Sequence, residues 1–405
     1  MEDTSGQFEI KGKSLLMFAM SQYGDWQSGV QNRNFHVFDQ MILDSEIDKI
    51  LVVSFAPTTW RRALKLFLRE LLFKGKTVKR FWGARCYQMS NKIYVYASLR
   101  TYFGKSDLEN LKFLSTHLNL KNRILWHYDV LNYDAYRELK ESGDFQVFDA
   151  VDNWLEHSSY KKFADRLNKN YDHLLSDSHL VLAVSRHLAD YLKKRSAQPE
   201  IVHFLPNASD QSLLSGDNLN NQTQYKKLEE LRQKYAQVLG YIGVIQKDRL
   251  DFPLLEEILI SYPEKAVVLA GPIWKDLQAR CQRLADHYPN LCLLGNVHRN
   301  DWRAVANYFD LAIAPHLTGG FMSYISPTKI YEYLAVGLPV VSTPVSDVDL
   351  LAGQVLIAAS PEEFIVGISD LLAVENHAKR IARRKFIADN HLWEHRYQEI
   401  KKLLK

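Results

Sequence analysis

Short apolar runs alternate with segments of helical periodicity along almost the whole chain. This alternation is typical of parallel α/β domains, in which each buried strand is followed by a helix. In the first half of the chain the predicted strands are 15–19, 50–53, 93–97, 123–126, 145–148, 180–184 and 201–205. In the second half they are 240–245, 266–270, 291–294, 311–314, 339–342 and 355–358. We therefore predict an α/β protein with two doubly wound parallel sheets, which bind ligands at the C-terminal ends of their strands.

A polar stretch at 209–224, rich in Asn, Ser and Gln, interrupts the alternation and is the best candidate for a domain boundary. A chain of 405 residues is also too long for one ordinary core. We predict an N-terminal domain of residues 1–208 and a second domain of residues 209–385. A C-terminal helix at 386–405 is expected to pack back towards the N-terminal domain.

The start of one helix, near residue 326, is marked in detail. Ser326 is expected to cap the helix by accepting a hydrogen bond, and Pro327 suits the first helical position. Gly337 can adopt the left-handed conformation that ends a helix. Lys329 falls in the first turn, where the helix dipole disfavours a cation, so an anion is expected to bind there too.

The residues around this helix start fit a phosphate and a sugar. Gly319 and Gly320 follow the predicted strand 311–314 and allow backbone amides to approach a ligand closely. Glu332 lies one turn beyond the expected anion, where a carboxylate can accept hydrogen bonds from sugar hydroxyls. The alternative is a solvated Lys329 and Glu332 on an ordinary amphipathic helix, and the spacing alone leaves both open.

Composition and charge exclude several other classes of protein. The chain is 46% hydrophobic and 24% charged, as is usual for globular proteins, and a net charge of +4 is too small to indicate nucleic-acid binding. The three cysteines form no CxxC pair, which argues against a zinc site or a disulfide framework and favours a reducing, cytosolic compartment. No apolar run is long enough to span a membrane, and the first residues are too polar for a signal peptide. We expect a cytoplasmic protein.

Residues 60–74 combine an apolar stripe at helical spacing with basic residues on the other side, and the positive run continues to Arg85. A basic amphipathic helix can lie on an anionic membrane surface, which would make the protein peripheral at the inner face of the plasma membrane. The alternative is an ordinary outer helix whose apolar face belongs to the core.

The best-marked segment, SPTKIYEYLAVGLPVVST, follows DLAIAPH and resembles the nucleotide-sugar site of GT-B glycosyltransferases, especially family 4. Other pieces agree in order, namely SQYGDWQSGVQNRNFHVF at 21–38, FDAVDNW at 148–154, LAVSRHL at 182–188, LPNASD at 205–210 and GYIGVIQKDRLDFPLL at 240–255. This order is similar to the bacterial branch that includes the teichuronic-acid-biosynthesis glycosyltransferases.

The resemblance implies a GT-B fold, with two Rossmann-like domains facing across a cleft. It also implies an enzyme that moves a sugar from a nucleoside-diphosphate donor to a glycan or lipid-linked acceptor in cell-surface polysaccharide synthesis. Such an enzyme would retain the anomeric configuration and need no metal and no cofactor.

The resemblance further implies roles for single residues. Glu332 would bind the ribose hydroxyls, and Thr328 and Lys329 would meet the diphosphate. Arg249 and Lys247 would supply further cationic contacts. The residues that the resemblance and the pattern together place in the donor site are Gly24, Gly243, Lys247, Gly319, Gly320, Ser326, Thr328, Lys329 and Glu332, with Gly24 in a loop of the N-terminal domain.

One departure concerns the choice of donor sugar. Family 4 members usually carry a second glutamate eight residues before the position of Glu332, and this chain has Tyr324 there. The missing glutamate leaves open a non-catalytic member that binds a glycan or a partner. A UDP-sugar epimerase of similar two-domain shape is the alternative enzyme class.

Candidate residues for the acceptor side follow the strand 145–148. His157 or Glu156 could orient the acceptor hydroxyl or act as a general base, and His127 is a similar candidate. Asp152 is the favoured residue, because it ends a strand in a recognisable motif. For each histidine a purely structural role is the alternative. Lys329 and Arg249 are the candidates for stabilising the charge that develops on the leaving diphosphate.

Asp347 and Asp349 have the DxD spacing of metal-dependent glycosyltransferases. They follow a predicted strand, where aspartates usually serve as turn residues. We therefore predict no metal site.

Overall fold

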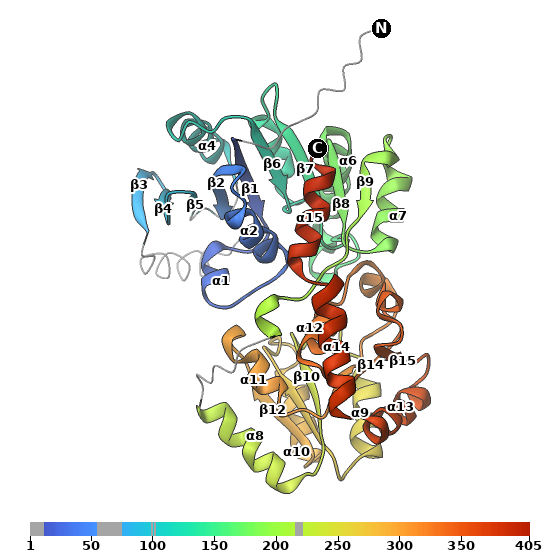
Figure 1. Ribbon diagram of the computed structural model, residues 1–405. Coiled ribbons are helices and arrows are strands. Elements are labelled where there is room, and N and C mark those ends of the chain that lie inside the picture. The colour runs from blue at the N-terminus through green and yellow to red at the C-terminus, as the bar shows by residue number, and fades with distance from the viewer. Residues whose placement is uncertain (1–11, 55–74, 99, 101–102, 215–221) are drawn as a thin grey trace. The chain divides into compact units, whose positions relative to one another are not determined.

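The computed structural model describes residues 12–54, 75–98, 100, 103–214 and 222–405 (Figure 1). The predicted helix at 60–74 lies outside these residues. Lys76, Lys79 and Arg80, which continue its positive run, lie on a strand, and Arg85 lies on the next one. No helix in the described ranges is long and apolar enough to cross a membrane.

The chain divides into two units. Unit 1 comprises Met1–Val184, Leu188–Leu205 and Tyr397–Lys405, and unit 2 comprises Ser185–His187 and Pro206–Arg396. The first division lies near the predicted limit at 208, but the chain returns to unit 1 only at Tyr397 and not after 385. The single helix predicted over 386–405 is wrong in its bounds, because two helices, His377–Asn390 and Trp393–Leu403, occupy this region. The end of the chain belongs to unit 1, where the Tyr397 hydroxyl donates to Asp44 Oδ2 (2.8 Å) and Lys401 pairs with the same carboxylate (3.0 Å).

Unit 1 contains a nine-stranded sheet in the order β3-β4-β5-β2-β1-β6-β7-β8-β9. The strands are β1 (Lys13–Ala19), β2 (Ile47–Ser54), β3 (Lys76–Phe81), β4 (Ala84–Gln88), β5 (Ile93–Ser98), β6 (Arg123–His127), β7 (Phe145–Ala150), β8 (Leu180–Ala183) and β9 (Val202–Phe204). The sheet is parallel from β5 to β9, and β3 and β4 extend it as an antiparallel hairpin. The predicted strands of this half are confirmed, and β1, β5, β6 and β8 are buried along their whole length.

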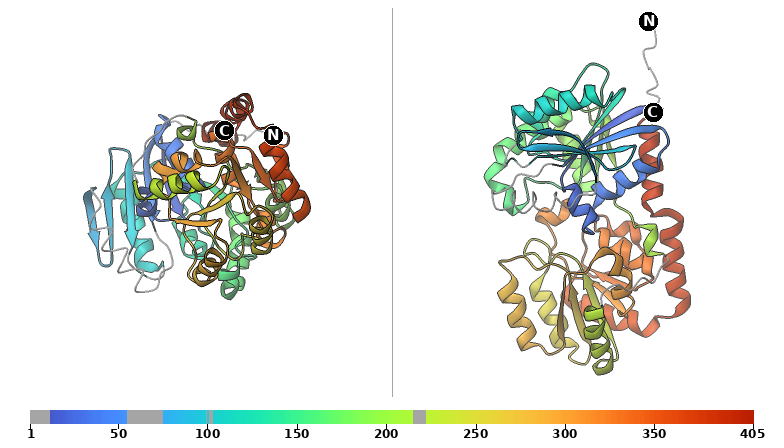
Figure 2. Two further views of the ribbon diagram at one scale, coloured as in Figure 1. Left: turned by 90° about the horizontal axis from the view of Figure 1, so that it is seen from below. Right: turned by 90° about the vertical axis from the view of Figure 1, so that its left-hand side faces the viewer.

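Helices lie on both faces of this sheet (Figure 2). They are α1 (Tyr23–Gln27), α2 (Arg33–Leu43), α4 (Lys105–His117), α5 (Tyr133–Tyr136), α6 (Ala164–Asp177), α7 (Arg186–Arg195) and α15 (Trp393–Leu403), of which α7 and α15 also include residues of unit 2. In α6 the buried side chains Leu167, Tyr171 and Leu174 recur at helical spacing and pack towards the sheet.

Unit 2 contains a six-stranded parallel sheet in the order β12-β11-β10-β13-β14-β15. The strands are β10 (Val238–Ile242), β11 (Ala266–Ala270), β12 (Leu291–Gly295), β13 (Leu311–Ala314), β14 (Val340–Ser342) and β15 (Val355–Ile357). All of these strands were predicted. The strand order reverses between β10 and β13, and ligands bind at such a switch point in open α/β sheets.

Two apolar clusters cover the two faces of this sheet. One contains Trp302, Tyr333 and Ile387, and the other contains Leu255 and Phe364. The helices of unit 2 are α8 (Gln222–Lys234), α9 (Phe252–Ser261), α10 (Gln278–His287), α11 (Trp302–Ala306), α12 (Thr328–Val336), α13 (Pro361–Val374) and α14 (His377–Asn390). Helices α11, α12 and α14 therefore share one face, and α9 and α13 share the other.

Candidate functional site

The helix that carries the predicted phosphate site is α12, and it begins one residue later than predicted. Pro327 is the residue before the first turn and makes no side-chain cap, so the predicted cap by Ser326 is wrong. The Ser326 hydroxyl instead accepts a hydrogen bond from the backbone N–H of Asn207 (3.2 Å). The Asn207 side chain donates to Ser326 O (3.0 Å) and Thr328 Oγ1 (2.9 Å). Asn207 therefore fixes the chain at the start of α12.

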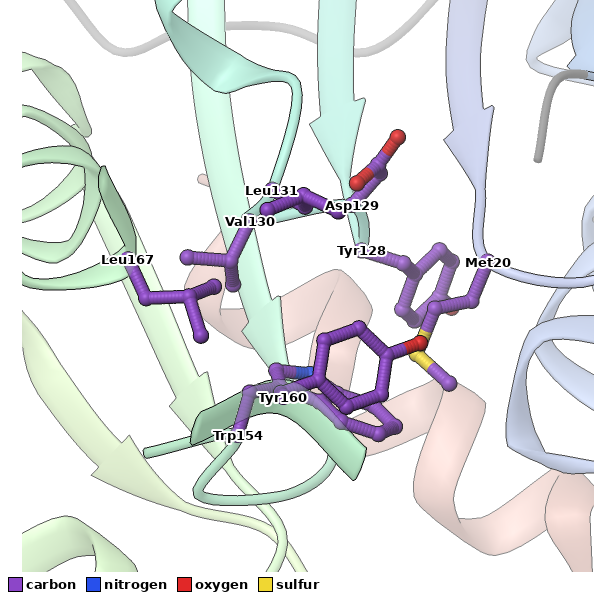
Figure 3. A pocket seen from close by; sticks show the side chains of 8 residues that line it. All are labelled: Met20, Tyr128, Asp129, Val130, Leu131, Trp154, Tyr160 and Leu167. Atoms are coloured by element: carbon purple, nitrogen blue, oxygen red, sulfur yellow. The ribbon is translucent and has the colours of Figure 1, made fainter. Parts of the chain in front are cut away.

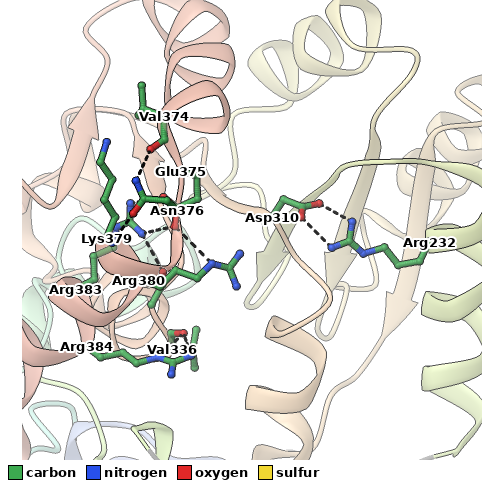
Figure 4. A network of polar contacts seen from close by, with 11 residues as sticks. Arg232, Asp310, Val336, Val374, Glu375, Asn376, Lys379, Arg380, Arg383 and Arg384 are labelled. Carbon is green, nitrogen blue, oxygen red and sulfur yellow. Dashed lines mark hydrogen bonds and ion pairs between the residues drawn. The ribbon is translucent and has the colours of Figure 1, made fainter.

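The other end of α12 is fixed by α14 (Figure 4). Gly337 has φ +87° and ends the helix as predicted. Arg384 donates to Val336 O (3.0 Å), and Arg383 donates to Gly337 O (3.0 Å) while it pairs with Glu375 (2.6 Å). Two arginines thus bind the carbonyls that a helix end leaves without partners.

Glu332 lies at the centre of a buried cluster of charges. Its side chain is 1% exposed, so it is not on a solvated helix face. Arg299 Nη1 lies 2.5 Å from Oε1, and Lys329 Nζ lies 2.9 Å from Oε2. Burial raises the pKa of this carboxyl, but Lys329 and Arg299 outweigh burial and bring the pKa down to about 2. Glu332 is therefore an ionised acceptor at neutral pH.

Arg299 was not predicted from the sequence. It opens a short 3-10 helix (Arg299–Asp301) that follows β12, and its side chain is 7% exposed. Its Nη2 lies 3.6 Å from Asp210 Oδ2. Within the described part of the chain, its Nε and Nη2 have no hydrogen-bond partner. The only sequence signal was its place shortly after the predicted strand 291–294.

Trp302 lies beneath the two cations of this cluster. The guanidinium carbon of Arg299 is 5.9 Å from the indole centroid, and Lys329 Nζ is 5.7 Å from it. The Lys329 side chain is 35% exposed, so solvent can reach the lysine but not the carboxylate.

The glycine-rich loop lines a pocket of unit 2. Gly319 and Gly320 have φ values of +83° and +53°, and both are exposed. A pocket of about 200 Å³ is lined by His187, Thr318, Gly319, Met322, Ser323, Pro344, Val345 and Ser346. The loop continues into a 3-10 helix (Gly320–Tyr324), where Tyr324 O accepts a hydrogen bond from Ser185 Oγ (2.9 Å). The ring centroids of Tyr324 and His187 lie 4.6 Å apart.

Arg249 lies beside this loop. Its carbonyl accepts a hydrogen bond from Leu317 N (2.8 Å), and an isolated bridge between Leu250 and His316 joins the segments after β10 and β13. Its guanidinium lies 5.9 Å from the ring of Phe321. The Nε atom of Arg249 is buried without a hydrogen-bond partner in the described ranges. The structure therefore brings Arg249 together with the glycine loop.

Gly243 and Lys247 follow β10 as well. A Cβ atom on Gly271, opposite, would lie 2.0 Å from the carbonyl oxygen of Gly243, so the two backbones touch. Gly243 N donates to Ala270 O (2.8 Å). Lys247 is exposed.

In unit 1, His157 and His127 have structural roles. His157 Nδ1 accepts a hydrogen bond from Ser159 N (3.2 Å) and caps a 3-10 helix (Ser158–Phe163). His127 is 1% exposed and stacks on Phe18 with ring centroids 4.5 Å apart. Burial lowers the pKa of His127 to about 3, so it is a neutral core side chain.

Asp152 and Gly24 occupy different kinds of local structure. Asp152 follows β7, and its carbonyl accepts a hydrogen bond from the Tyr171 hydroxyl (3.0 Å). Gly24 lies buried inside the short helix α1, so the prediction that places it in a loop is wrong. Five residues are too few to show a helical periodicity, so the pattern of apolar positions could not predict this helix.

A small cavity of about 30 Å³ lies where β1, β6 and β7 end (Figure 3). It is lined by Met20, Tyr128, Asp129, Val130, Leu131, Trp154, Tyr160 and Leu167. The Asp129 carboxylate points away from the cavity and accepts hydrogen bonds from the Asn132 side chain (2.7 Å) and the Tyr136 hydroxyl (2.8 Å). The walls are therefore mostly apolar and aromatic, with room for about one water-sized group.

Asp347 and Asp349 are engaged by Arg186. Its Nε lies 2.7 Å from Asp347 Oδ1, and its Nη2 pairs with Asp349. Asp347 has φ +59° and precedes a 3-10 turn, as expected for a turn residue. Among the described residues, no group of three or more His, Cys, Asp or Glu side chains is placed to hold a metal ion.

Comparison with known proteins finds a family match in unit 2. Residues 236–374 match the family model described as glycosyl transferases group 1. The matched residues all lie in unit 2. A putative teichuronic acid biosynthesis glycosyltransferase of Bacillus subtilis (strain 168), TuaH, is 26% identical over 223 residues, which are 53% of this chain and 54% of that protein. The match thus spans about half the length of the curated relative.

Solved structures share the fold of the whole chain. The Anabaena protein HepE in complex with UDP and glucose gives a TM-score of 0.66 at 13% identity and covers 97% of this chain and 99% of its own. Sucrose-phosphate synthase from Thermosynechococcus elongatus gives a TM-score of 0.67 at 11% identity and covers 96% of this chain and 98% of its own. Trehalose-6-phosphate synthase OtsA gives a TM-score of 0.66 at 11% identity and covers 97% of this chain and 99% of its own. These are GT-B proteins, and the predicted GT-B fold is confirmed.

Proposed function

We propose that this protein is a glycosyltransferase that moves a sugar from a nucleoside-diphosphate sugar to a glycan or lipid-linked acceptor in cell-surface polysaccharide synthesis. The observation that carries the proposal is the buried, ionised Glu332 between Lys329 and Arg299, at the start of a helix in a glycosyltransferase group 1 domain. The B. subtilis relative is named for teichuronic acid biosynthesis, which supports a cell-envelope polymer as the product.

Glu332 is proposed to bind the ribose of the donor. An ionised carboxylate accepts hydrogen bonds and cannot donate them, so two vicinal hydroxyls of a ribose suit its two oxygens. Arg299 is proposed to hold this carboxylate in place, since its guanidinium is buried against Glu332. HepE binds UDP, which supports a nucleoside diphosphate as the leaving group.

Lys329 is proposed to leave Glu332 when the diphosphate binds, because it is exposed enough to reach a ligand at the first turn of α12. Breaking the sugar–phosphate bond increases the negative charge on the leaving diphosphate. Lys329, Arg249 and the positive end of the α12 dipole would stabilise that charge, which is why we propose transfer without a metal ion. Thr328 and Ser326 border the same phosphates, and Gly319 and Gly320 let the loop approach them.

The acceptor is proposed to bind unit 1 near Asp152, with retention of the anomeric configuration. The protein is proposed to work in the cytoplasm, with an anionic membrane surface as a partner. Residues 60–85 are the predicted contact, and only 75–85 of them are described.

Thermal unfolding with UDP tests the donor site. A nucleotide at a hundred times its dissociation constant should add about 2.7 kcal/mol to the stability of the folded state, and hence raise Tm by about 5–10 °C. Lys329→Ala should show a clearly smaller shift, whereas Glu257→Gln, an exposed site on α9, should behave as wild type. Equal shifts in all three proteins would remove Lys329 from the site.

Product analysis separates the alternatives. Incubation with a panel of UDP-sugars and oligosaccharide acceptors should yield UDP together with an elongated glycan. A change in the donor sugar without release of UDP would identify an epimerase instead. Tight UDP binding with neither product would indicate a non-catalytic member, the alternative that Tyr324 allows.

A further inference from the structure

The β3–β4 hairpin has an exposed tryptophan at its turn. Trp82 is 93% exposed, more than any other large hydrophobic side chain in the described ranges. It lies with Gly83 between the paired residues Phe81 and Ala84, and Gly83 has φ +72°, which a tight turn requires. Arg100 donates to Trp82 O (2.5 Å). The backbone at the turn is therefore fixed while the indole remains in solvent.

Positive charge surrounds this indole. Lys76, Lys79 and Arg80 are exposed on β3, and Arg85 follows on β4. The sequence from 75 to 98 contains no Asp and no Glu. Within the described part of the chain, Lys76, Lys79 and Arg80 make no ion pair. Because the net charge of the whole chain is only +4, the hairpin concentrates positive charge at one edge of the sheet.

A second aromatic residue extends the apolar part of this surface. Phe113 on α4 is 43% exposed, and its ring lies 5.9 Å from that of Phe81. Lys79 Nζ lies 5.2 Å from the same ring. The exposed surface thus combines an indole, a phenyl ring and several cations, carried by the β3–β4 hairpin and α4.

We propose that this hairpin surface, made of Lys76, Lys79, Arg80, Trp82 and Phe113, docks on an anionic lipid bilayer. Indoles favour the membrane–water interface, where an apolar ring and a polar N–H are both accommodated. Lysine and arginine near an anionic leaflet are attracted to its headgroups. No pocket is needed, because the turn itself enters the headgroup layer. The charge and the exposed indole therefore fit a lipid surface better than a folded protein partner.

The inference rests on the proposed function in one respect, since a lipid-linked acceptor would bring the enzyme to a membrane. Docking and transfer can nevertheless be measured separately. Sedimentation of the full chain with vesicles, in the absence of any donor or acceptor, reports docking only.

The test compares phosphatidylcholine vesicles with vesicles that also contain phosphatidylglycerol. The wild-type protein should sediment only with the anionic vesicles, and binding should weaken as salt rises. Each cation near the surface contributes about fivefold to binding, so Lys79→Glu/Arg80→Glu should lower it at least tenfold. Trp82→Ser should lower vesicle binding about fivefold, because the variant lacks the indole whose transfer from water into the bilayer interface favours docking.

Two control variants match these changes. Lys193→Glu/Lys194→Glu reverses the same charge at two exposed adjacent positions on α7, and Leu43→Ser removes a side chain that is 74% exposed. Both should bind like wild type, and all variants should keep the UDP-induced rise in Tm. Equal losses in Lys193→Glu/Lys194→Glu and Lys79→Glu/Arg80→Glu would show a mere net-charge effect and overturn the proposal. Unchanged binding of Trp82→Ser, or binding to an acidic polysaccharide or nucleic acid but not to vesicles, would also overturn it.

Discussion

Replacing Glu332 by glutamine tests the charged cluster directly. The substitution keeps the size of the side chain and one oxygen acceptor but removes the negative charge between Arg299 and Lys329. Arg299 is 7% exposed, so its charge would stay buried opposite a neutral amide. Breaking a buried pair in this way costs more than the pair is worth, because one ion loses its partner without regaining water.

The pKa of Glu332 gives the size of the effect. A fall from its ordinary value of 4.5 to about 2 corresponds to about 3 kcal/mol in favour of the ionised, folded state. Solvent partly screens the attraction between Lys329 and Glu332, because the Lys329 side chain is 35% exposed. The figure of about 3 kcal/mol is therefore an upper value for the contribution of the two cations. For a unit of this size, about 3 kcal/mol lowers Tm by about 6–12 °C.

The dependence on pH separates charge from packing. Glu332 protonates near pH 4.5 in the unfolded chain and near pH 2 in the folded one, so its contribution is complete above pH 4.5 and disappears as pH falls towards 2. The difference in unfolding free energy between wild type and Glu332→Gln should therefore be largest near neutral pH and shrink below pH 4.5. Calorimetry or denaturant unfolding over this range measures it.

A double-mutant cycle completes the test. Arg299→Met alone should also be costly, because Glu332 would lose its buried partner. Arg299→Met/Glu332→Gln should cost less than the sum of the two single changes by about 1–3 kcal/mol. A loss below about 1 kcal/mol in Glu332→Gln, with no change between pH 7 and pH 3, would refute the reasoning and mean that water reaches the cluster.

Three further outcomes are expected. Lys329→Ala should lower kcat about ten- to a hundredfold in steady-state kinetics with less effect on the KM of the donor, since charge on the leaving phosphate grows during the reaction; a pure KM effect would contradict this. Transfer should persist in excess EDTA, and a complete loss that Mg²⁺ or Mn²⁺ restores would contradict metal independence. Gly240→Ala should destabilise by about 1–3 kcal/mol, since a Cβ there would lie 1.9 Å from the ring of Phe309, whereas Gly104→Ala, with nothing within 4 Å, should be nearly neutral.

The sequence predicted the strands well because buried parallel strands are continuous apolar runs. It missed β3, in which half of the residues are basic and most are exposed. It also missed β4, a five-residue strand in which Arg85 and Gln88 interrupt the apolar residues. Their position at the edge of the sheet explains this pattern, since one side of β3 has no neighbouring strand.

The site was predicted only as far as local sequence determines it. Lys329, Glu332 and Gly337 follow from the pattern of a single helix. The partners of these residues do not, because Asn207 lies 119 residues from Ser326 and Arg299 lies 33 residues from Glu332. The predicted cap was wrong for the same reason, because the Ser326 hydroxyl accepts a hydrogen bond from the backbone N–H of Asn207. The contacts of His157 with Ser159 N and of His127 with Phe18 could not be predicted from the spacing of residues in the sequence.

The ion pair between Lys329 and Glu332 has a consequence for how parts of a ligand act together. In the proposed donor site, a ribose would gain full access to Oε2 of Glu332 when Lys329 turns away from it, and the phosphates would receive the lysine. A nucleoside without phosphates, or a diphosphate without a nucleoside, would separate the two side chains and satisfy only one of them. The two halves of a nucleotide should therefore bind with strong positive cooperativity inside a single molecule, and the affinity for UDP should exceed what uridine and pyrophosphate predict separately.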